Sequence, residues 1–304
     1  MTQDNKDTST ADMATPDHGP IVEETPKPGQ VSMDAKPSKL SQFRTILLRI
    51  TLALIILCPL TFMMAGLGSR FGLWSWQFGL GTLTREVGPL LLAVTLVMGV
   101  LSMLAFFLIK PRKGWIVAAL AIFIPAAAFI QLNIVRGTVA DLPLIHDITT
   151  DTQDPPVFGD VIVAERAAVD GVNTLEYNGK RAPTSERDAE GKPVTKLVSA
   201  LQTQAYPEVR TLVLSESPDV AFGRAEQVVR DMGWAIKESD VAAGRIDATD
   251  TTFWYGFKDD VTIRLRPAEG GGTRLDVRSV SRVGLSDIGA NAARVQIFLD
   301  AMAE

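Results

Sequence analysis

The chain has 304 residues, of which 46% are hydrophobic and 21% charged, and its formal net charge is −5. This acidic balance argues against a nucleic-acid-binding protein, which would carry a clustered basic surplus. A single cysteine, Cys58, excludes an intramolecular disulfide framework and a thiolate zinc site, and two histidines leave little imidazole chemistry. We expect no cofactor and no bound metal.

The N-terminal 43 residues are predicted to form a disordered cytoplasmic tail. Residues 1–40 contain five prolines and many Thr, Ser, Asp and Lys residues, with almost no aliphatic cluster. Such a segment cannot bury enough apolar surface to offset the conformational entropy that ordering would cost.

Three uncharged apolar stretches follow, over residues 50–68, 87–109 and 114–135. A helix rises about 1.5 Å per residue, so roughly 20 apolar residues cross the hydrocarbon core of a bilayer. We therefore predict a three-helix transmembrane region over residues 44–136, with the lipid bilayer as its partner. Because no Asp, Glu, His, Lys or Arg lies inside any of the three stretches, a transporter or pump is disfavoured.

The lysines and arginines near these stretches set the expected orientation. Seven of them precede the first stretch or follow the second, whereas three lie on the opposite side of the expected membrane. The seven are Lys36, Lys39, Arg44, Arg49, Lys110, Arg112 and Lys113. The three are Arg70, Arg85 and Arg136. Cytoplasmic loops carry the excess of basic residues. The N-terminus is therefore predicted to be cytoplasmic, and the C-terminal domain periplasmic, in a bacterial inner membrane.

Two further features support a retained membrane anchor. The first apolar stretch begins too far along the chain for an ordinary cleaved signal peptide. Leu73, Trp74, Trp76 and Phe78 lie in the expected loop between the first two stretches, where such side chains favour the boundary between headgroups and water.

Residues 137–304 are long enough for one soluble domain. Acidic residues outnumber basic ones here, which is the opposite of a domain that binds anionic lipid by charge. The first half of this region is irregular: a helix is predicted over residues 194–204, and a mobile polar loop over residues 178–193.

The second half has clear secondary-structure signals. A short strand over residues 211–214 precedes a helix that runs from Pro218 to Met232, with Ser217 as its N-cap and Gly233 as its stop. The predicted buried stripe of this helix is Ala221, Ala225, Val228 and Met232.

Four strands are predicted next, over residues 234–238, 245–253, 261–266 and 273–282. In the third, apolar and polar residues alternate, as in an antiparallel strand with one buried and one polar face. A last helix is predicted from Asp287, capped by Ser286, with an inner stripe of Ile288, Ala292, Val295, Leu299 and Met302. The fold class is therefore a membrane-anchored α+β protein, in which three transmembrane helices precede an antiparallel sheet with helices packed on one face.

Two groups of segments are too specific in sequence for plain scaffolding: residues 145–158, and residues 257–260 with 276–294. From His146 to the C-terminus the sequence resembles the bacterial domain-of-unknown-function family 1499. The resemblance implies a shared fold and frequent membrane attachment in proteobacteria. It implies no catalytic residues, because the family is named for having no assigned activity.

A set of polar side chains near the C-terminus forms a candidate ligand site. Arg278 and Arg282 project to one side of their strand, and positions 287, 291 and 294 share one helix face. The candidates are Arg278, Arg282, Asp287, Asn291 and Arg294, which could line a groove for an anionic or glycan ligand. The alternative, which we favour, is a structural network in which the arginines pair with Asp260, Asp276 or Asp287.

A weaker hypothesis makes His146 a general base, oriented by Asp147 or Asp151, for hydrolysis of an ester or glycosidic bond. In the alternative, the Asp and Thr side chains of this segment form local turns. The sequence has no nucleophile elbow, zinc-protease motif or phosphate loop. Asp147, Asp151 and Asp154 also depart from the spacing of a calcium-binding loop.

An aromatic run at residues 253–257 favours a core or strand-edge position over a partner-binding or sugar-stacking surface.

Taken together, the sequence predicts a membrane-tethered periplasmic binding or scaffolding module of the cell envelope. Envelope proteins, or an anionic or glycan ligand, are its candidate partners, and nucleic acid is not. The alternative function is a hydrolase-type enzyme that uses His146.

Overall fold

The computed structural model describes residues 38–304. The prediction of a disordered tail falls largely on residues 1–37, which lie outside the described residues. Its boundary at residue 43 is wrong, because the first helix already begins at Lys39.

Within the described residues, three helices are long and apolar enough to cross a membrane. They are α1 (Lys39–Arg70), α2 (Gly88–Leu108), which continues the π-helix η1 (Gln77–Val87), and α3 (Trp115–Ala140). The three predicted stretches are confirmed. α1 extends beyond its stretch at both ends, α3 extends beyond its stretch at the C-terminal end, and η1 lengthens the second helix at its start. The loop between α1 and η1 is shorter than expected, so that Phe78 belongs to η1.

Small and polar side chains join these helices to one another. A Cβ atom placed on Gly99 of α2 would lie 2.8 Å from the backbone carbon of Ala121 in α3, so glycine permits the close approach of the two helices. The hydroxyls of Thr51 in α1 and Ser102 in α2 hydrogen-bond at 2.8 Å. Closer to the start of α1, the buried Arg44 donates to backbone carbonyls of the loop between α2 and α3.

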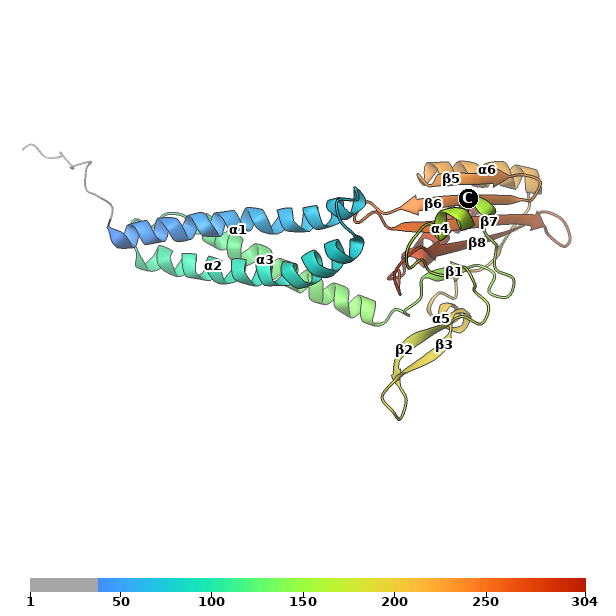
Figure 1. Cartoon of the computed structure of the whole chain (residues 1–304). Helices are drawn as coiled ribbons and strands as arrows, with labels where there is room; N and C mark the ends of the chain where they lie inside the picture. The colour runs from blue at the N-terminus through green and yellow to red at the C-terminus, as the bar shows by residue number, and fades with distance from the viewer. Residues whose placement is uncertain (1–37) are drawn as a thin grey trace, which may run out of the picture. The chain divides into compact units, whose positions relative to one another are not determined.

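An antiparallel sheet forms the centre of the C-terminal region (Figure 1). Its strands are β1 (Asp147–Thr149), β4 (Leu212–Leu214), β5 (Ala235–Asp240), β6 (Arg245–Thr251), β7 (Lys258–Pro267) and β8 (Thr273–Ser281). The order is β1-β8-β7-β6-β5, and β4 pairs with the other end of β8. The helices of this region are α4 (Asp160–Ala167), α5 (Val198–Ala205), α6 (Pro218–Asp231) and α7 (Ala290–Ala303). The predicted α+β fold class is confirmed.

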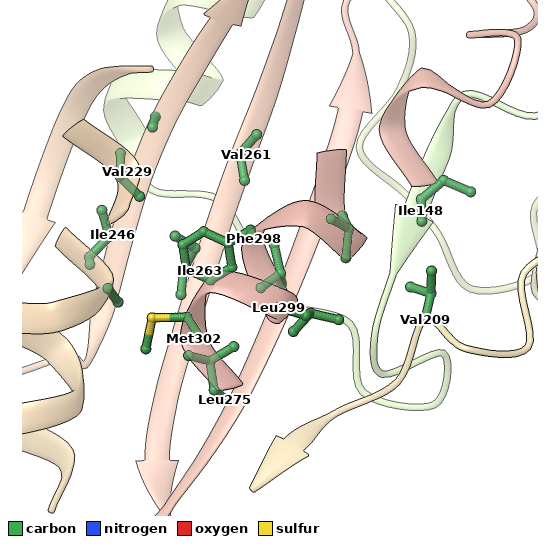
Figure 2. Packing of buried hydrophobic residues seen from close by; sticks show 14 of the residues in the cluster. Ile148, Val209, Val229, Ile246, Val261, Ile263, Leu275, Phe298, Leu299 and Met302 are labelled. Atoms are coloured by element: carbon green, nitrogen blue, oxygen red, sulfur yellow. The ribbon is translucent and has the colours of Figure 1, made fainter. Parts of the chain in front are cut away.

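One face of the sheet is apolar and lies under α6 and α7. Figure 2 shows Phe298, Leu299 and Met302 of α7 directed at Ile263 and Leu275 of the sheet. All five side chains are buried, and burial of apolar area is the main favourable term in folding. This face positions the strands and thereby the side chains on their opposite face.

Two details of the helix predictions are wrong. Helix α7 begins at Ala290 instead of Asp287, which leaves Ile288 53% exposed and puts Phe298 into the buried stripe. In α6, Phe222 and Val229 are fully buried, whereas the predicted Val228 and Met232 are only partly buried. Ser217 occupies the N-cap position of α6, but its side chain makes no capping hydrogen bond.

The polar loop predicted over residues 178–193 is wrong, because the structure has a hairpin of β2 (Arg181–Arg187) and β3 (Pro193–Leu197). The helix predicted over residues 194–204 is present as α5, which begins later, at Val198. The carboxylate of Asp188 fixes the turn by accepting hydrogen bonds from two backbone amides. Most residues of this hairpin are solvent-exposed, so the sequence lacks the apolar alternation that marks a strand.

Candidate functional site

The second face of the sheet is polar and also buried, which differs from the expected solvent-facing side. Asp260 and Thr262 of β7 and Arg278 of β8 lie on it, and each is nearly inaccessible to solvent. Residues between β1 and β2, including α4, cover this face. Phe158 and Ile162 from this cover pack with Val280 in a small apolar cluster. Asp260, Thr262 and Arg278 are therefore enclosed, whereas Arg266 and Arg274, at the far end of the same face, are partly exposed.

Asp260 is the centre of the first ion-pair cluster on this face. Its carboxylate accepts from the guanidinium groups of Arg166 at 2.7 Å and Arg282 at 2.8 Å, and from the Thr249 hydroxyl at 2.8 Å. Arg282 also donates to Glu165 at 2.7 Å. Hydrogen bonds from Lys237 and Arg282 lower the pKa of Glu165. The two carboxylates of this cluster, Asp260 and Glu165, therefore face two arginines and one lysine.

Arg278 and Asp147 form the second cluster. Two guanidinium nitrogens reach the two carboxylate oxygens at 3.0 and 2.9 Å, a bidentate pair. The same guanidinium donates to the carbonyl of Leu175 at 2.6 Å and lies 5.5 Å from the ring centres of Phe158 and Tyr177. Arg278 is therefore held by charge, hydrogen bonds and aromatic rings at once.

A third cluster, around Asp276, was not predicted as a site. Arg264 donates to its carboxylate at 3.0 Å and Arg274 at 3.2 Å. Burial alone would raise the pKa of Asp276, but bonds from Thr211 and Arg264 lower it below its usual value. The alternation of charged residues along β7 and β8 is the sequence signal that could have identified this cluster, because it places them on one face.

The other three predicted residues lie on the helix side of the sheet. Arg294 of α7 donates to Asp259 at 2.7 Å and to Asp250 at 2.9 Å. Asn291 donates to the carbonyl of His146 at 3.1 Å. Asp287 accepts from the backbone amides of Gly289 and Asn291, and so caps α7 from outside the helix.

The sheet therefore divides the five candidate ligand residues into two sets. Arg278 and Arg282 share the polar face, while Asp287, Asn291 and Arg294 surround the start of α7 on the opposite face. One groove cannot contain both sets. In this arrangement the three arginines have carboxylate partners within the domain, but only Arg282 pairs with a partner that the structural alternative named, Asp260. Arg278 pairs with Asp147 instead, and Arg294 with Asp250 and Asp259. A ligand at any of the three stays a prediction.

The histidine of the hydrolase hypothesis lies at the start of β1. Nε2 of His146 is 3.0 Å from the Lys180 ammonium nitrogen, and Nδ1 is buried without a hydrogen-bond partner. Burial, followed by the charge of Lys180, lowers the pKa of His146 to about 4, so the ring is neutral at pH 7. Burial lowers the pKa of Lys180 as well.

The two aspartates proposed to orient this ring are engaged elsewhere. Asp147 pairs with Arg278, as described above. Asp151 pairs with Arg274 and accepts from the backbone amides of Gln153 and Asp154 at 3.0 and 2.9 Å, which is a local Asx turn. Neither carboxylate bonds to the His146 ring. The part of the expected general-base arrangement that the structure provides is the neutral imidazole of His146.

Comparison with known protein families identifies the family of the C-terminal domain. Residues 147–302, just over half of the chain, match the family described as "Protein of unknown function (DUF1499)". The chain belongs to the DUF1499 family. The matched range begins at β1 and ends in α7, so the sheet and all three ion-pair clusters belong to the DUF1499 domain. No curated protein matches the chain.

A groove of about 630 Å³ lies at one side of the DUF1499 domain. Its walls are the last turn of α3 with the segment that follows it, the β2–β3 hairpin, and α5. The lining includes the apolar Leu142 and Leu201 and the polar Ser185, Arg187 and Gln204. Among residues 38–304, no group of three or more His, Cys, Asp or Glu side chains could hold a metal ion.

Proposed function

We propose that this protein is a membrane-tethered binding or scaffolding module of the bacterial cell envelope, with its DUF1499 domain on the periplasmic side of the inner membrane. The basic residues near the apolar stretches support this orientation, because they gather in the N-terminal part of α1 and between α2 and α3. An odd number of spans then places the domain on the other side.

The observation that carries the proposal is the enclosed polar face. Arg278 and Arg282 are buried and paired, so the charged interior holds the cover to the sheet. A catalytic site needs a reacting group that a substrate can reach. A domain whose charged centre is closed in this way meets its partners through its surface.

The groove beside the β2–β3 hairpin is the surface we assign to binding. Its volume of about 630 Å³ lies within the range of small-molecule sites. Apolar and polar side chains line it together, and Arg187 supplies a cation that suits an anionic group or a glycan. A segment of an envelope protein is the other candidate occupant.

Topology is tested with reporter fusions in a Gram-negative host. Alkaline phosphatase, which is active only in the periplasm, is fused after Glu304 and, as the matched control, after Lys113 between α2 and α3. We expect activity from the first fusion and none from the second. The reverse pattern would place the domain in the cytosol and end the envelope proposal.

Binding at the groove is tested by photocrosslinking in intact membranes. A benzophenone amino acid replaces Ser185 in the groove or, as control, the exposed Asp231 at the end of α6. We expect a discrete adduct from position 185 that position 231 does not give. Equal adduct patterns from the two positions would contradict the groove as a binding surface.

A hydrolase-type function is the second candidate, and the neutral ring of His146 is the observation that favours it. The test is hydrolysis of para-nitrophenyl acetate by the full chain in nanodiscs. Activity that His146→Gln abolishes would support an enzyme, whereas equal rates for the two proteins would remove this candidate.

A further inference from the structure

The loop between β6 and β7 (residues 252–257), here called the hairpin tip, is fixed in shape and rich in aromatic side chains. The Thr252 hydroxyl donates to the carbonyl of Trp254 at 2.7 Å and accepts from the amide of Phe257 at 2.9 Å. Tyr255 and Gly256 both have positive φ angles, 62° and 65°, which turn the chain sharply. The tip therefore presents its rings in a defined arrangement.

The hairpin tip contacts the C-terminal end of α1 through its backbone. The amide of Tyr255 donates to the carbonyl of Gly66 at 3.2 Å, and Arg70 donates to the carbonyl of Thr252 at 2.6 Å. A Cβ atom on Gly66 would lie 2.7 Å from the Trp254 ring, so this glycine gives the ring its place on the helix. Gly66 belongs to the apolar stretch that is predicted to cross the membrane.

Side chains of the tip also contact η1 and the residue before it. The hydroxyls of Tyr255 and Thr84 hydrogen-bond at 2.6 Å, and the rings of Phe257 and Trp76 pack edge to face at 5.7 Å between centres. The tip is thus held at the level where α1 ends and η1 begins. In a chain whose apolar helices cross a bilayer, this level is the boundary between headgroups and water.

Two rings of the tip nevertheless remain partly exposed, although the Arg70 guanidinium lies 5.5 Å from the centre of the Phe253 ring and the Trp254 ring packs on Gly66. Phe253 is 63% exposed and Trp254 is 47% exposed, and the two rings contact each other edge to face at 5.0 Å. Phe71 and Leu73, in the turn after α1, are exposed as well. Exposed aromatic and aliphatic side chains gathered at the end of a membrane-spanning helix are typical of the lipid interface, where aromatic rings are enriched.

We propose that the hairpin tip inserts Phe253 and Trp254 into the headgroup boundary of the bilayer, so that the DUF1499 domain contacts the lipid surface directly. The contact is apolar, which agrees with the acidic character of the domain, because no attraction to anionic lipid is needed. The tip would then hold the domain in one orientation against the membrane. This inference holds on either side of the membrane and is independent of the proposed location and groove.

The experiment measures the depth of the tip with the full chain in phosphatidylcholine nanodiscs. In a Cys58→Ala background, Phe253→Cys carries a polarity-sensitive fluorophore. The matched control is Val241→Cys, since Val241 is also exposed but lies in the turn at the opposite end of β6. Nitroxides on the lipid headgroup or high on the acyl chain quench the label from the membrane side, and iodide quenches it from water.

We expect quenching by lipid nitroxides to be at least about twofold stronger at position 253 than at position 241, with the iodide order reversed. Addition of anionic lipid should leave the result unchanged. A label at 253 that only iodide quenches would overturn the proposal. A label shielded from both quenchers would also overturn it, in favour of a protein partner or a second copy of the chain. Trp254→Cys repeats the measurement if Phe253→Cys changes the melting temperature.

Discussion

The two faces of the main sheet are both buried, but by different kinds of side chain. Under α6 and α7 the strands present Val261, Ile263 and Leu265, which are shielded by other apolar groups. Under α4 and its flanking segments the same sheet presents carboxylates and arginines such as Asp260 and Arg278. One strand, β7, supplies both faces because its side chains alternate.

The contrast teaches where the domain can tolerate change. Apolar packing is non-directional, so an apolar substitution of similar volume costs little. A buried charge depends on its particular partner, and removal of one member leaves the other uncompensated. Substitutions on the polar face are therefore poorly tolerated, and its ion pairs hold α4 and the flanking segments in one position. The predictions below test this difference.

The largest effect is expected from Asp260→Ala, which leaves Arg166 and Arg282 without their shared carboxylate. We expect a loss of about 3–5 kcal/mol in the free energy of unfolding, since two buried cations lose their partner. Chemical or thermal unfolding of the full chain in nanodiscs measures it. Asp231→Ala, at an exposed position, is the control and should stay within about 0.5 kcal/mol of the wild type. Equal stability of the two variants would show that the buried pairs do not stabilise the cover.

A smaller loss is expected on the apolar face. Ile263→Ala removes a fully buried side chain that packs under α7, and we expect a cost of about 3 kcal/mol. Ile263→Val should cost only about 1 kcal/mol, because most of the volume is retained. Asp260→Asn, which also changes little in volume, should cost more than Ile263→Val. The opposite order would contradict the proposed difference between the faces.

His146 gives the polar side of the domain a dependence on pH. Its pKa is about 4 in the folded protein and 6.5 in the unfolded reference, so acidification protonates the unfolded chain first. Stability should therefore fall as the pH drops from about 6.5 to about 4, by up to about 3 kcal/mol from this residue. His146→Gln cannot titrate. We therefore expect the difference in unfolding free energy between wild type and variant to change between pH 7 and pH 4. A difference that stays constant over this range would refute the prediction.

The sequence predicted the apolar face well, because its signals are local. Val261, Ile263 and Leu265 alternate with polar residues, and the helix and turn signals around α6 and β8 place those elements to within a few residues. The hairpin of β2 and β3 gives no such signal, because its strands expose most of their side chains. The elements that bury an apolar side were the predictable ones.

The polar face could be predicted only in part. That Arg278 and Arg282 share one side of β8 follows from strand geometry. Which carboxylate each arginine meets does not follow, since Asp147 is 131 positions from Arg278 and several other aspartates lie closer in sequence. The cover formed by α4 was also not predicted, because a helix of eight residues is too short to show a clear helical period.

The smallest expected effect concerns the start of α7, where the helix face and the polar network meet. Asp287 lies before the helix, yet its carboxylate accepts from the amides of Gly289 and Asn291 and so takes over the role of an N-cap. Burial raises the pKa of Asp287, which means that its charge is not well solvated. Asp287→Ala removes the acceptor and should cost about 1 kcal/mol.

Asp287→Asn is the matched variant, because its side-chain oxygen can accept the same bonds without the charge. We expect its stability to lie close to that of the wild type, as asparagine caps helices about as well as aspartate. If Asp287→Asn instead loses as much as Asp287→Ala, the charge itself must be needed at the helix start. The capping bonds would then be secondary to the negative charge of Asp287.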